Sequence, residues 1–366
     1  MEKDGMTKGD YSFDARLAFA KTPPAEWYFD PSMLAREQET VFARTWQLVG
    51  RAEEVAEAGQ FFTANVGDEP VLVARGADSR LRALSNVCRH RAGPVAAGRG
   101  NCDVFRCGYH GWSYALDGRL AATPEWDGVE EFDRGAHSLP QFRVETWGAL
   151  VFVNLDANCE PLGETLEDIP ARLARRDLSS MRFALRKEWT VECNWKVYVD
   201  NYLEGYHIPV VHPALNRELD YARYRTETKR LYSIQHSPIR ADRATRIKVD
   251  EGAEENEAQY FWLFPNLMLN VYPDNYSTNL IVPLSAERTL TVFEWYFDEP
   301  ESGKSREALR RTVEFSDEIQ IEDIQICEAV QRGLRSRTYA QGRYSVKREN
   351  GVHHFHGLLA EFFARA

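Results

Sequence analysis

Two short pairs of cysteine and histidine constrain this chain more than any other feature. One residue separates Cys88 from His90, two separate Cys107 from His110, and residues 91–106 lie between the pairs. Together they offer two thiolates and two imidazoles, which can hold zinc or a two-iron cluster with both histidines on one iron. Structural zinc sites usually space the ligands of each half two to four residues apart, and the Cys88 half is tighter. The motif favours an iron-sulfur cluster, with a zinc module as the alternative.

Composition narrows the class of protein. With 366 residues, of which 43% are hydrophobic, the chain can build two domains or one large one. The net charge of -11 with no basic block argues against nucleic acid and membrane surfaces as partners. No apolar run is long enough to span a membrane, and Met1–Gly5 does not open a secretory signal, so we expect a cytoplasmic protein. Six cysteines in such a chain point to metal ligation, not to disulfides.

Residue patterns predict three regions. Residues 1–47 form an arm and a helix that begins at Pro31, after the cap Asp30. Residues 48–155 alternate short apolar runs with glycine-containing turns, which is typical of a small all-β domain. Residues 156–366 predict one α+β domain. Its expected elements are helices over 164–177, 196–208 and 305–334, a strand approach over 181–195 and antiparallel strands over 229–298 that turn at Asp274-Asn275.

A second group of polar residues follows in the third region. On a helix, Asp200, Glu204 and His207 fall within about 60° of one another. Pro209 ends that helix and lets the chain turn, which can bring His212 back toward His207. Two histidines at a helix break are reasonable metal ligands, although they could equally be ordinary hydrogen-bonded histidines.

A distant carboxylate supports the metal interpretation. On a helix from Ser316 to Leu334, with Ser316 as a cap, Asp323 falls inside the apolar stripe. A carboxylate buried there needs a cation, a donor or a metal. Its neighbour Glu322 falls at the polar edge and is interpreted as surface charge. Two histidines and one carboxylate form the ligand set of non-haem Fe(II) oxygenases.

Both segments resemble known sequences. Asn86–Pro94 and Cys107–Tyr114 closely resemble the Rieske 2Fe-2S domain. This resemblance implies that Cys88 and Cys107 bind one iron and that His90 and His110 bind the outer iron. Cys102 is then a bystander.

Over nearly its whole length, the chain resembles the α subunits of Rieske non-haem iron oxygenases. The implied fold is a small all-β Rieske domain and a catalytic domain with an antiparallel sheet wrapped by helices, of the helix-grip or START-like kind; residues 1–47 would pack with the latter. His207, His212 and Asp323 would bind the mononuclear iron. Glu204 takes the place of the acid that bridges this site to His110 of a neighbouring subunit. Asn201 matches a family asparagine near the iron, and Asp200 is a candidate for the same polar network.

The resemblance also implies partners. Electrons from NAD(P)H would reach the cluster through a flavin-containing reductase, directly or by way of a ferredoxin, and pass to Fe(II), which activates O2 beside a small-molecule substrate. Because this route crosses between subunits, it implies a homotrimer or a trimer-based hexamer.

The substrate class stays open at this level. Asp200–Pro209 and Phe264–Asn270 resemble the choline monooxygenase-like branch, which favours hydroxylation or N-demethylation of a quaternary amine. Aromatic side chains could form a cage for such a cation, or simply belong to the core. The candidates are Tyr202, Tyr206, Trp262, Phe264, Tyr272, Phe293 and Trp295. The alternatives are hydroxylation of an aromatic ring, O-demethylation of an aromatic acid, and a Rieske protein that only carries electrons.

Overall fold

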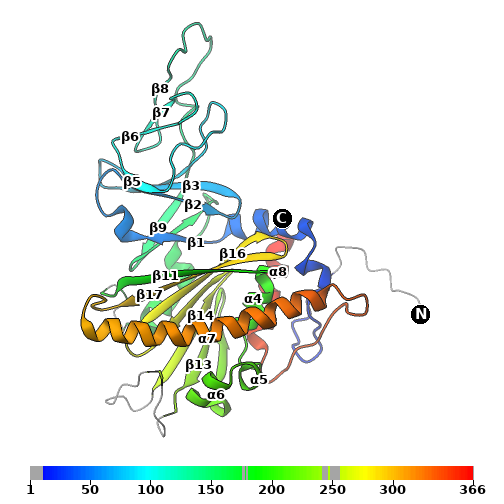
Figure 1. Ribbon diagram of the computed structural model, residues 1–366. Coiled ribbons are helices and arrows are strands. Elements are labelled where there is room, and N and C mark those ends of the chain that lie inside the picture. The colour runs from blue at the N-terminus through cyan, green and yellow to red at the C-terminus, as the bar shows by residue number, and fades with distance from the viewer. Residues whose placement is uncertain (1–10, 175–177, 179, 241–245, 248–255, 366) are drawn as a thin grey trace. The chain divides into compact units, whose positions relative to one another are not determined.

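The computed structural model describes residues 11–174, 178, 180–240, 246–247 and 256–365. These residues form two compact units (Figure 1). The smaller unit comprises Phe42–Leu173, and the larger comprises the chain up to Val41 and from Ala174 onward.

The smaller unit is built almost entirely from antiparallel strands. Its large sheet has the order β1-β10-β9-β4-β3-β2-β5, and a three-stranded sheet has the order β6-β7-β8. The strands are β1 (Gln47–Arg51), β2 (Gln60–Val66), β3 (Glu69–Arg75), β4 (Leu81–Ser85), β5 (Arg99–Asn101), β6 (Val104–Arg106), β7 (Ser113–Ala115), β8 (Leu120–Ala122), β9 (Gln141–Trp147) and β10 (Leu150–Asn154). Short helices are η2 (Phe42–Arg44), η3 (Ala52–Val55), α2 (Leu162–Leu166) and α3 (Ile169–Arg172).

Local sequence explains the hairpin β2–β3. Val66 pairs with Glu69, and Gly67 between them adopts φ 59°, a conformation that glycine reaches without a steric penalty. Phe62 and Val66 of β2 and Val71 and Val73 of β3 then face one core, which also includes Val153. This agrees with the all-β pattern predicted for the region.

The larger unit combines one antiparallel sheet with helices. The sheet order is β11-β17-β16-β15-β14-β13-β12. Its strands are β11 (Arg182–Val191), β12 (Arg225–Thr228), β13 (Tyr232–Pro238), β14 (Glu257–Leu263), β15 (Leu267–Val271), β16 (Tyr276–Ser285) and β17 (Arg288–Phe297). The helices are η1 (Ala25–Tyr28), α1 (Pro31–Thr40), α4 (Trp195–Tyr202), α5 (Ile208–Val211), α6 (Pro213–Glu218), η4 (Tyr221–Arg223), α7 (Gly303–Leu334) and α8 (Asn350–Ala364).

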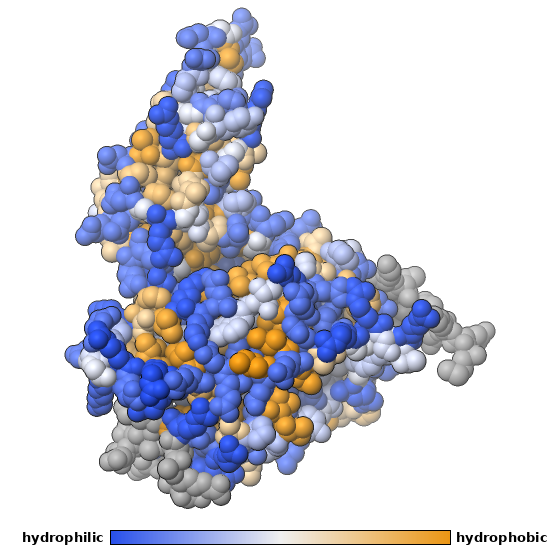
Figure 2. Space-filling model, viewed as in Figure 1, coloured by the Kyte–Doolittle hydropathy of each residue, from blue (hydrophilic) through white to orange (hydrophobic). Residues whose placement is uncertain are grey.

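Helix α7 crosses one face of this sheet (Figure 1). Ser302 caps it by accepting a hydrogen bond from the Ser305 backbone, so Ser316, the expected cap, lies within the helix. Its inner side buries Val313 and Phe315. Ion pairs between arginines and glutamates line its outer side near the N-terminus, and Figure 2 shows this end of the face as strongly hydrophilic.

The α+β class and its two kinds of sheet are confirmed, and the predicted turn at Asp274-Asn275 joins β15 to β16. Two segments lie differently from the expected division at 47/48 and 155/156. Residues 42–47 and 156–173 both belong to the smaller unit, because Trp46 donates to the backbone of Glu160 and Glu145 accepts from Leu162.

Helix boundaries also differ from the expected ones. In place of one helix over 164–177, the structure has α2 and α3; residues 175–177 lie outside the described part of the chain. The N-terminal helix begins at Pro31 with Asp30 as its cap, as predicted, but ends at Thr40 and not near Gln47.

Candidate metal centres and active-site cavity

Two tight loops of the smaller unit hold the first cysteine and histidine group. In one, the backbone N–H of Cys88 donates to the carbonyl of Gly93 at 2.8 Å. In the other, the backbone N–H of Cys107 donates to the carbonyl of Trp112, and the N–H of Gly111 donates to the carbonyl of Cys107. Gly111 has φ +74°, which explains why glycine occupies this turn.

Within these loops the sulfur and nitrogen ligands take different positions. Cys88 and Cys107 are buried, His90 is half-buried and His110 is exposed. The two imidazole rings lie 4.6 Å apart, centre to centre. This arrangement suits a cluster whose inner iron takes the thiolates and whose outer iron takes the histidines.

Three details fit such a group. Nδ1 of His90 is buried and has no hydrogen-bond partner among the described residues. Buried polar atoms usually have a partner, so this nitrogen fits a metal ligand. A Cβ atom on Gly93 would lie 3.2 Å from the sulfur of Cys107, so glycine leaves room beside that sulfur. Burial, followed by the charges of His110 and Arg91, lowers the pKa of His90 and favours the neutral imidazole that binds metals.

Aromatic side chains surround this group. The hydroxyl of Tyr114 lies 3.3 Å from the sulfur of Cys88 and accepts from the backbone of Arg89. The ring of Trp112 stacks on His90 at 5.0 Å. Cys102 packs at the edge of the same core, within the loop between the two pairs.

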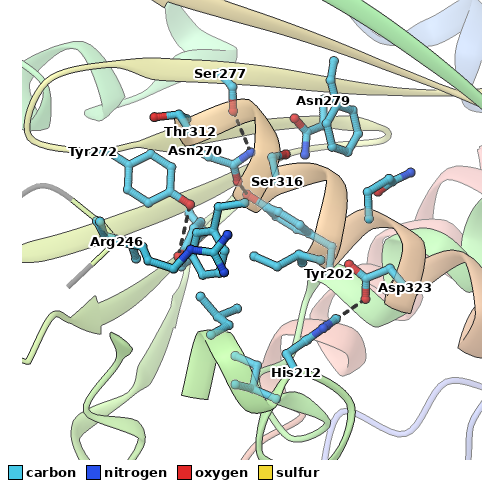
Figure 3. A pocket seen from close by; sticks show the side chains of 18 of the residues that line it. Tyr202, His212, Arg246, Asn270, Tyr272, Ser277, Asn279, Thr312, Ser316 and Asp323 are labelled. Atoms are coloured by element: carbon cyan, nitrogen blue, oxygen red, sulfur yellow. Dashed lines mark hydrogen bonds and ion pairs between the residues drawn. The ribbon is translucent and has the colours of Figure 1, made fainter. Parts of the chain in front are cut away.

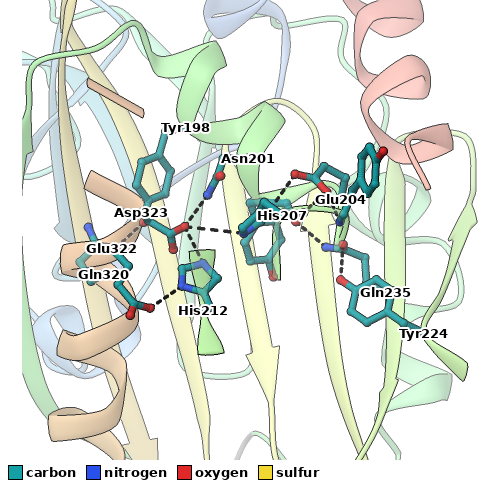
Figure 4. A network of polar contacts seen from close by, with 12 residues as sticks. Tyr198, Asn201, Glu204, His207, His212, Tyr224, Gln235, Gln320, Glu322 and Asp323 are labelled. Carbon is teal, nitrogen blue, oxygen red and sulfur yellow. Dashed lines mark hydrogen bonds and ion pairs between the residues drawn. The ribbon is translucent and has the colours of Figure 1, made fainter. Parts of the chain in front are cut away.

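The second group lies in the larger unit (Figure 4). One ligand atom from each of His207, His212 and Asp323 falls within 4.8 Å of the other two. Asp323 Oδ1 lies 3.0 Å from His212 Nε2 and 3.8 Å from His207 Nε2. The structure thus brings together three residues that the sequence suggested as ligands of one metal.

A break between helices makes this possible. Helix α4 ends at Tyr202, earlier than the predicted end at residue 208. Gly205 follows, and a Cβ there would lie 2.7 Å from the ring of Tyr224, so only glycine fits. His207 then precedes α5, and His212 stands between α5 and α6.

A carboxylate contacts the Nδ1 atom of each histidine. His207 Nδ1 lies 2.6 Å from Glu204 Oε1, and His212 Nδ1 lies 2.6 Å from Glu322 Oε2. This leaves Nε2 of both rings facing Asp323 and orients them as metal ligands usually are. Burial alone would lower the pKa of His212, but Asp323 and Glu322 together raise it.

Glu322 was interpreted from sequence as surface charge, and that interpretation is wrong. Its side chain does lie at the edge of the apolar stripe of α7, but His212 packs against that edge. A carboxylate immediately before a predicted ligand was the only local signal.

The other two predicted site residues, Asn201 and Asp200, belong to different polar networks. Asn201 donates from Nδ2 to Asp323 Oδ1 at 2.6 Å and so belongs to the group. Asp200 accepts a hydrogen bond from Tyr28 at 2.8 Å and lies 2.9 Å from His356 Nε2. These partners place Asp200 in a separate buried network that ties the N-terminal segment to α8.

A cavity of about 160 Å³ opens onto the His207–His212–Asp323 group (Figure 3). Four of the seven aromatic residues proposed from sequence line it: Tyr202, Tyr272, Phe293 and Trp295. Trp262 and Phe264 instead pack against Phe355 in the core, and Tyr206 is exposed.

Four further aromatic residues line the cavity and were not proposed from sequence: Tyr198, Tyr224, Tyr260 and Phe315. Chemically, two imidazoles and one carboxylate at the end of an aromatic cavity suit a non-haem Fe(II) with positions open for O2 and substrate. A cluster-binding β domain and such a cavity in one chain define an oxygen-activating redox enzyme.

Comparison with known proteins identifies the family. Residues 178–364 match the model of the ring hydroxylating alpha subunit (catalytic domain), and residues 45–133 match the Rieske [2Fe-2S] domain. The chain therefore belongs to the Rieske oxygenase α subunits. It is an oxidoreductase that incorporates O2, with a Rieske 2Fe-2S domain and a mononuclear iron domain.

Individual relatives span almost the whole chain. Choline monooxygenase of Arabidopsis thaliana is 36% identical over 95% of this chain and 84% of its own length. The carnitine monooxygenase oxygenase subunit of Escherichia coli K12 is 33% identical over 96% of both chains.

Solved structures agree with this assignment. A quaternary ammonium Rieske monooxygenase superposes with a TM-score of 0.85 at 31% identity, covering 96% of this chain and 98% of that one. Naphthalene 1,2-dioxygenase from Rhodococcus sp. shares the fold, with a TM-score of 0.79 at 18% identity over 94% and 95% of the chains. Among the described residues, no helix combines the length and apolarity needed to cross a membrane.

Proposed function

We propose that this chain is the terminal oxygenase of a multicomponent system that hydroxylates a quaternary amine. The observation that carries the proposal is the aromatic cavity that ends at His207, His212 and Asp323. Aromatic faces attract a trimethylammonium group through cation–π interactions, and a ligand set with open positions lies beside it. The similarity to choline and carnitine monooxygenases supports the same class of substrate.

The proposed sites follow from the donor sets. Cys88, His90, Cys107 and His110 hold the 2Fe-2S cluster, and His207, His212 and Asp323 hold the mononuclear iron. When bound, the iron supplies the redox chemistry that activates O2.

The protein's own polar groups would orient these ligands. Glu204 and Glu322 fix the Nδ1 side of the two histidines, and Asn201 restrains one oxygen of Asp323.

The reaction balances as a mono-oxygenation. One oxygen atom enters a C–H bond of the substrate, and the other leaves as water with two protons and two electrons. Hydroxylation at a carbon bonded to nitrogen gives a carbinolamine, which breaks into an aldehyde or ketone and a tertiary amine. The electrons come from NAD(P)H through a flavin-containing reductase, directly or by way of a ferredoxin.

Electron transfer is proposed to occur between subunits of a trimer or a trimer-based hexamer. In that assembly Glu204 bridges His207 to His110 of the neighbouring subunit. The exposure of His110 leaves it accessible to a partner chain. Inter-subunit electron transfer is described for the similar quaternary ammonium Rieske monooxygenase, which supports the same route here.

The test begins with metal content. The oxygenase should contain about three irons per chain with acid-labile sulfide, whereas an electron carrier would contain about two and a zinc protein none. A panel of quaternary amines and aromatic acids is then scored for oxygen uptake with a surrogate reductase, and the products are identified. Selective turnover of aromatic acids would overturn the quaternary amine assignment and leave the oxygenase assignment intact.

A further inference from the structure

The cavity has a second polar end, formed by arginines and hydroxyl groups. Arg246 and Arg311 both line it, together with Thr312 and Ser316 of α7. Figure 3 shows Arg246 directed toward the interior of the cavity, on the side of Tyr272. The central carbon of its guanidinium lies 4.2 Å from the centre of the Phe315 ring, a cation–π contact with a residue that also lines the cavity.

Helix α7 runs along the cavity from this end to the metal group. Arg311, Phe315, Ile319 and Asp323 repeat every four residues and all line the cavity, so one face of the helix runs along it. With a rise of about 1.5 Å per residue, Phe315 lies about 12 Å and Arg311 about 18 Å from Asp323 along the axis. An elongated small molecule can therefore contact both ends.

The two ends differ in charge. Carboxylates of Asp323 and Glu204 occupy the metal end, whereas the arginines occupy the other. Arg246 pairs through Nη1 with Glu318 at 2.7 Å, and a guanidinium has five N–H donors, so others can bind a second acceptor. Nη1 of Arg311 lies 3.6 Å from Oε1 of Glu307, which does not itself line the cavity.

A third acidic residue, Asp274, lines the cavity from the turn between β15 and β16. Asp274 accepts a hydrogen bond from the side chain of Asn275 at 2.8 Å. Each guanidinium has five N–H donors, and the ion pairs described above engage Nη1 of Arg246 with Glu318 and Nη1 of Arg311 with Glu307. The arginine end therefore has donors for an anionic ligand.

We propose that Arg246 and Arg311 form a carboxylate subsite, so that the substrate is a zwitterion. Its quaternary ammonium lies among the aromatic residues near His207, and a chain of a few carbons carries its carboxylate to the arginines. The ammonium half rests on the proposed function; the carboxylate half does not. Arginine binds carboxylates with charge-assisted, often paired hydrogen bonds. A simple amino alcohol such as choline has no group for this subsite.

Three related probes test each half separately. Gamma-butyrobetaine carries both charges, its carboxamide keeps only the ammonium, and the acid with a tert-butyl group in place of trimethylammonium keeps only the carboxylate. Binding to the purified holoenzyme is measured by calorimetry for the wild type, Arg246→Gln and Arg311→Gln. Arg310→Gln is the matched control, because Arg310 pairs with Glu307 and Glu314 on the outer face of α7.

Each arginine substitution should weaken binding of the two carboxylates about 10- to 100-fold, the scale of a lost charge-assisted hydrogen bond, and leave the carboxamide unchanged. Arg310→Gln should change none of the three. Arg246→Lys, which keeps the charge, should restore part of the lost affinity and guards against a local folding defect.

The remaining outcomes separate the two ideas. Equal affinity of the wild type for the carboxylate and the carboxamide, or equal weakening of all three probes by Arg246→Gln and Arg311→Gln, would overturn the carboxylate subsite. Equal affinity for the tert-butyl acid and gamma-butyrobetaine would overturn the ammonium preference and leave the subsite standing. Failure of all three probes to bind the wild type would overturn both.

Discussion

Nδ1 of His212 lies 2.6 Å from the carboxylate of Glu322, the residue immediately before the predicted ligand Asp323. The pair has a counterpart in His207 and Glu204, also at 2.6 Å. Adjacent residues of α7 therefore act on the two sides of one imidazole: Glu322 on Nδ1 and Asp323 on Nε2. Such outer carboxylates fix the tautomer and the direction of a ligating ring.

Glu322→Ala should lower the affinity for mononuclear iron about 10- to 100-fold, because His212 loses the acceptor that orients it. Glu322→Gln, which keeps an oxygen acceptor, should retain more. Iron content is measured during titration with a chelator. Glu314→Ala is the control on the same helix, since Glu314 forms an ion pair with Arg310 on the exposed side of α7. Unchanged iron affinity in Glu322→Ala would remove the orienting role.

Glu204→Gln should leave both metal centres loaded and uncouple cluster oxidation from product formation. The amide can still accept from the backbone N–H of His207, as the carboxylate does at 3.1 Å, but it loses the charge proposed to bridge to His110 of a neighbouring subunit. Single-turnover oxidation of the cluster and the ratio of product to oxygen consumed are measured, with iron content as the internal control. Normal coupled turnover would refute the bridge.

Tyr114→Phe should lower the reduction potential of the cluster by about 40 mV. The Tyr114 hydroxyl lies 3.3 Å from the sulfur of Cys88, and a hydrogen bond to a ligating sulfur stabilises the more negative reduced state by about 1 kcal/mol. A redox titration followed by electron paramagnetic resonance measures the shift. Tyr109→Phe, at a side chain that is 63% exposed, should leave the potential unchanged. Equal potentials in the wild type and Tyr114→Phe would show that the hydroxyl does not act on the cluster.

Glu37→Gln should destabilise the larger unit by about 3–5 kcal/mol, because it leaves the Lys196 ammonium buried without its counter-charge. Both side chains are fully buried, and they lie 2.6 Å apart. Urea unfolding measures the loss. The double variant Glu37→Gln/Lys196→Met should lose less than the sum of the single variants, whereas the exposed-pair control Glu314→Ala should lose about 0.5 kcal/mol or less. Additive losses would contradict a coupled pair.

His354 should make the protein less stable in mild acid. Burial lowers its pKa from 6.5 to about 4. Between these two pH values His354 is protonated in the unfolded chain and neutral in the folded chain. Its contribution to stability is complete above pH 6.5, falls as the pH drops, and reaches a loss of about 3 kcal/mol near pH 4. His354→Gln should flatten this part of the curve when unfolding is measured across about pH 4–7. A wild-type slope in the variant would assign the acid sensitivity to other groups.

Local sequence determined the parts of the site whose chemistry lies within a few residues. The spacing of Cys88, His90, Cys107 and His110 predicted two loops with a mixed ligand set. A carboxylate in an apolar stripe singled out Asp323. Pro209 was expected to end the helix that carries His207, but α4 already ends at Tyr202 and Pro209 lies in the first turn of α5. These features depend on backbone geometry and on neighbours in the chain, which a sequence pattern contains.

Only the tertiary structure decided what surrounds them. Helical periodicity placed Glu322 at the edge of the apolar stripe of α7. Its role depends on His212, which packs against that edge. Asp200 turned toward Tyr28 and His356, and Arg246 reached the cavity from a segment that no periodicity marks. Such contacts join residues far apart in sequence, because strand order and helix packing choose which side chains meet. The sequence thus specified the donors of the two proposed metal sites, and the packing of α7 against the sheet specified the cavity that lies beside one of them.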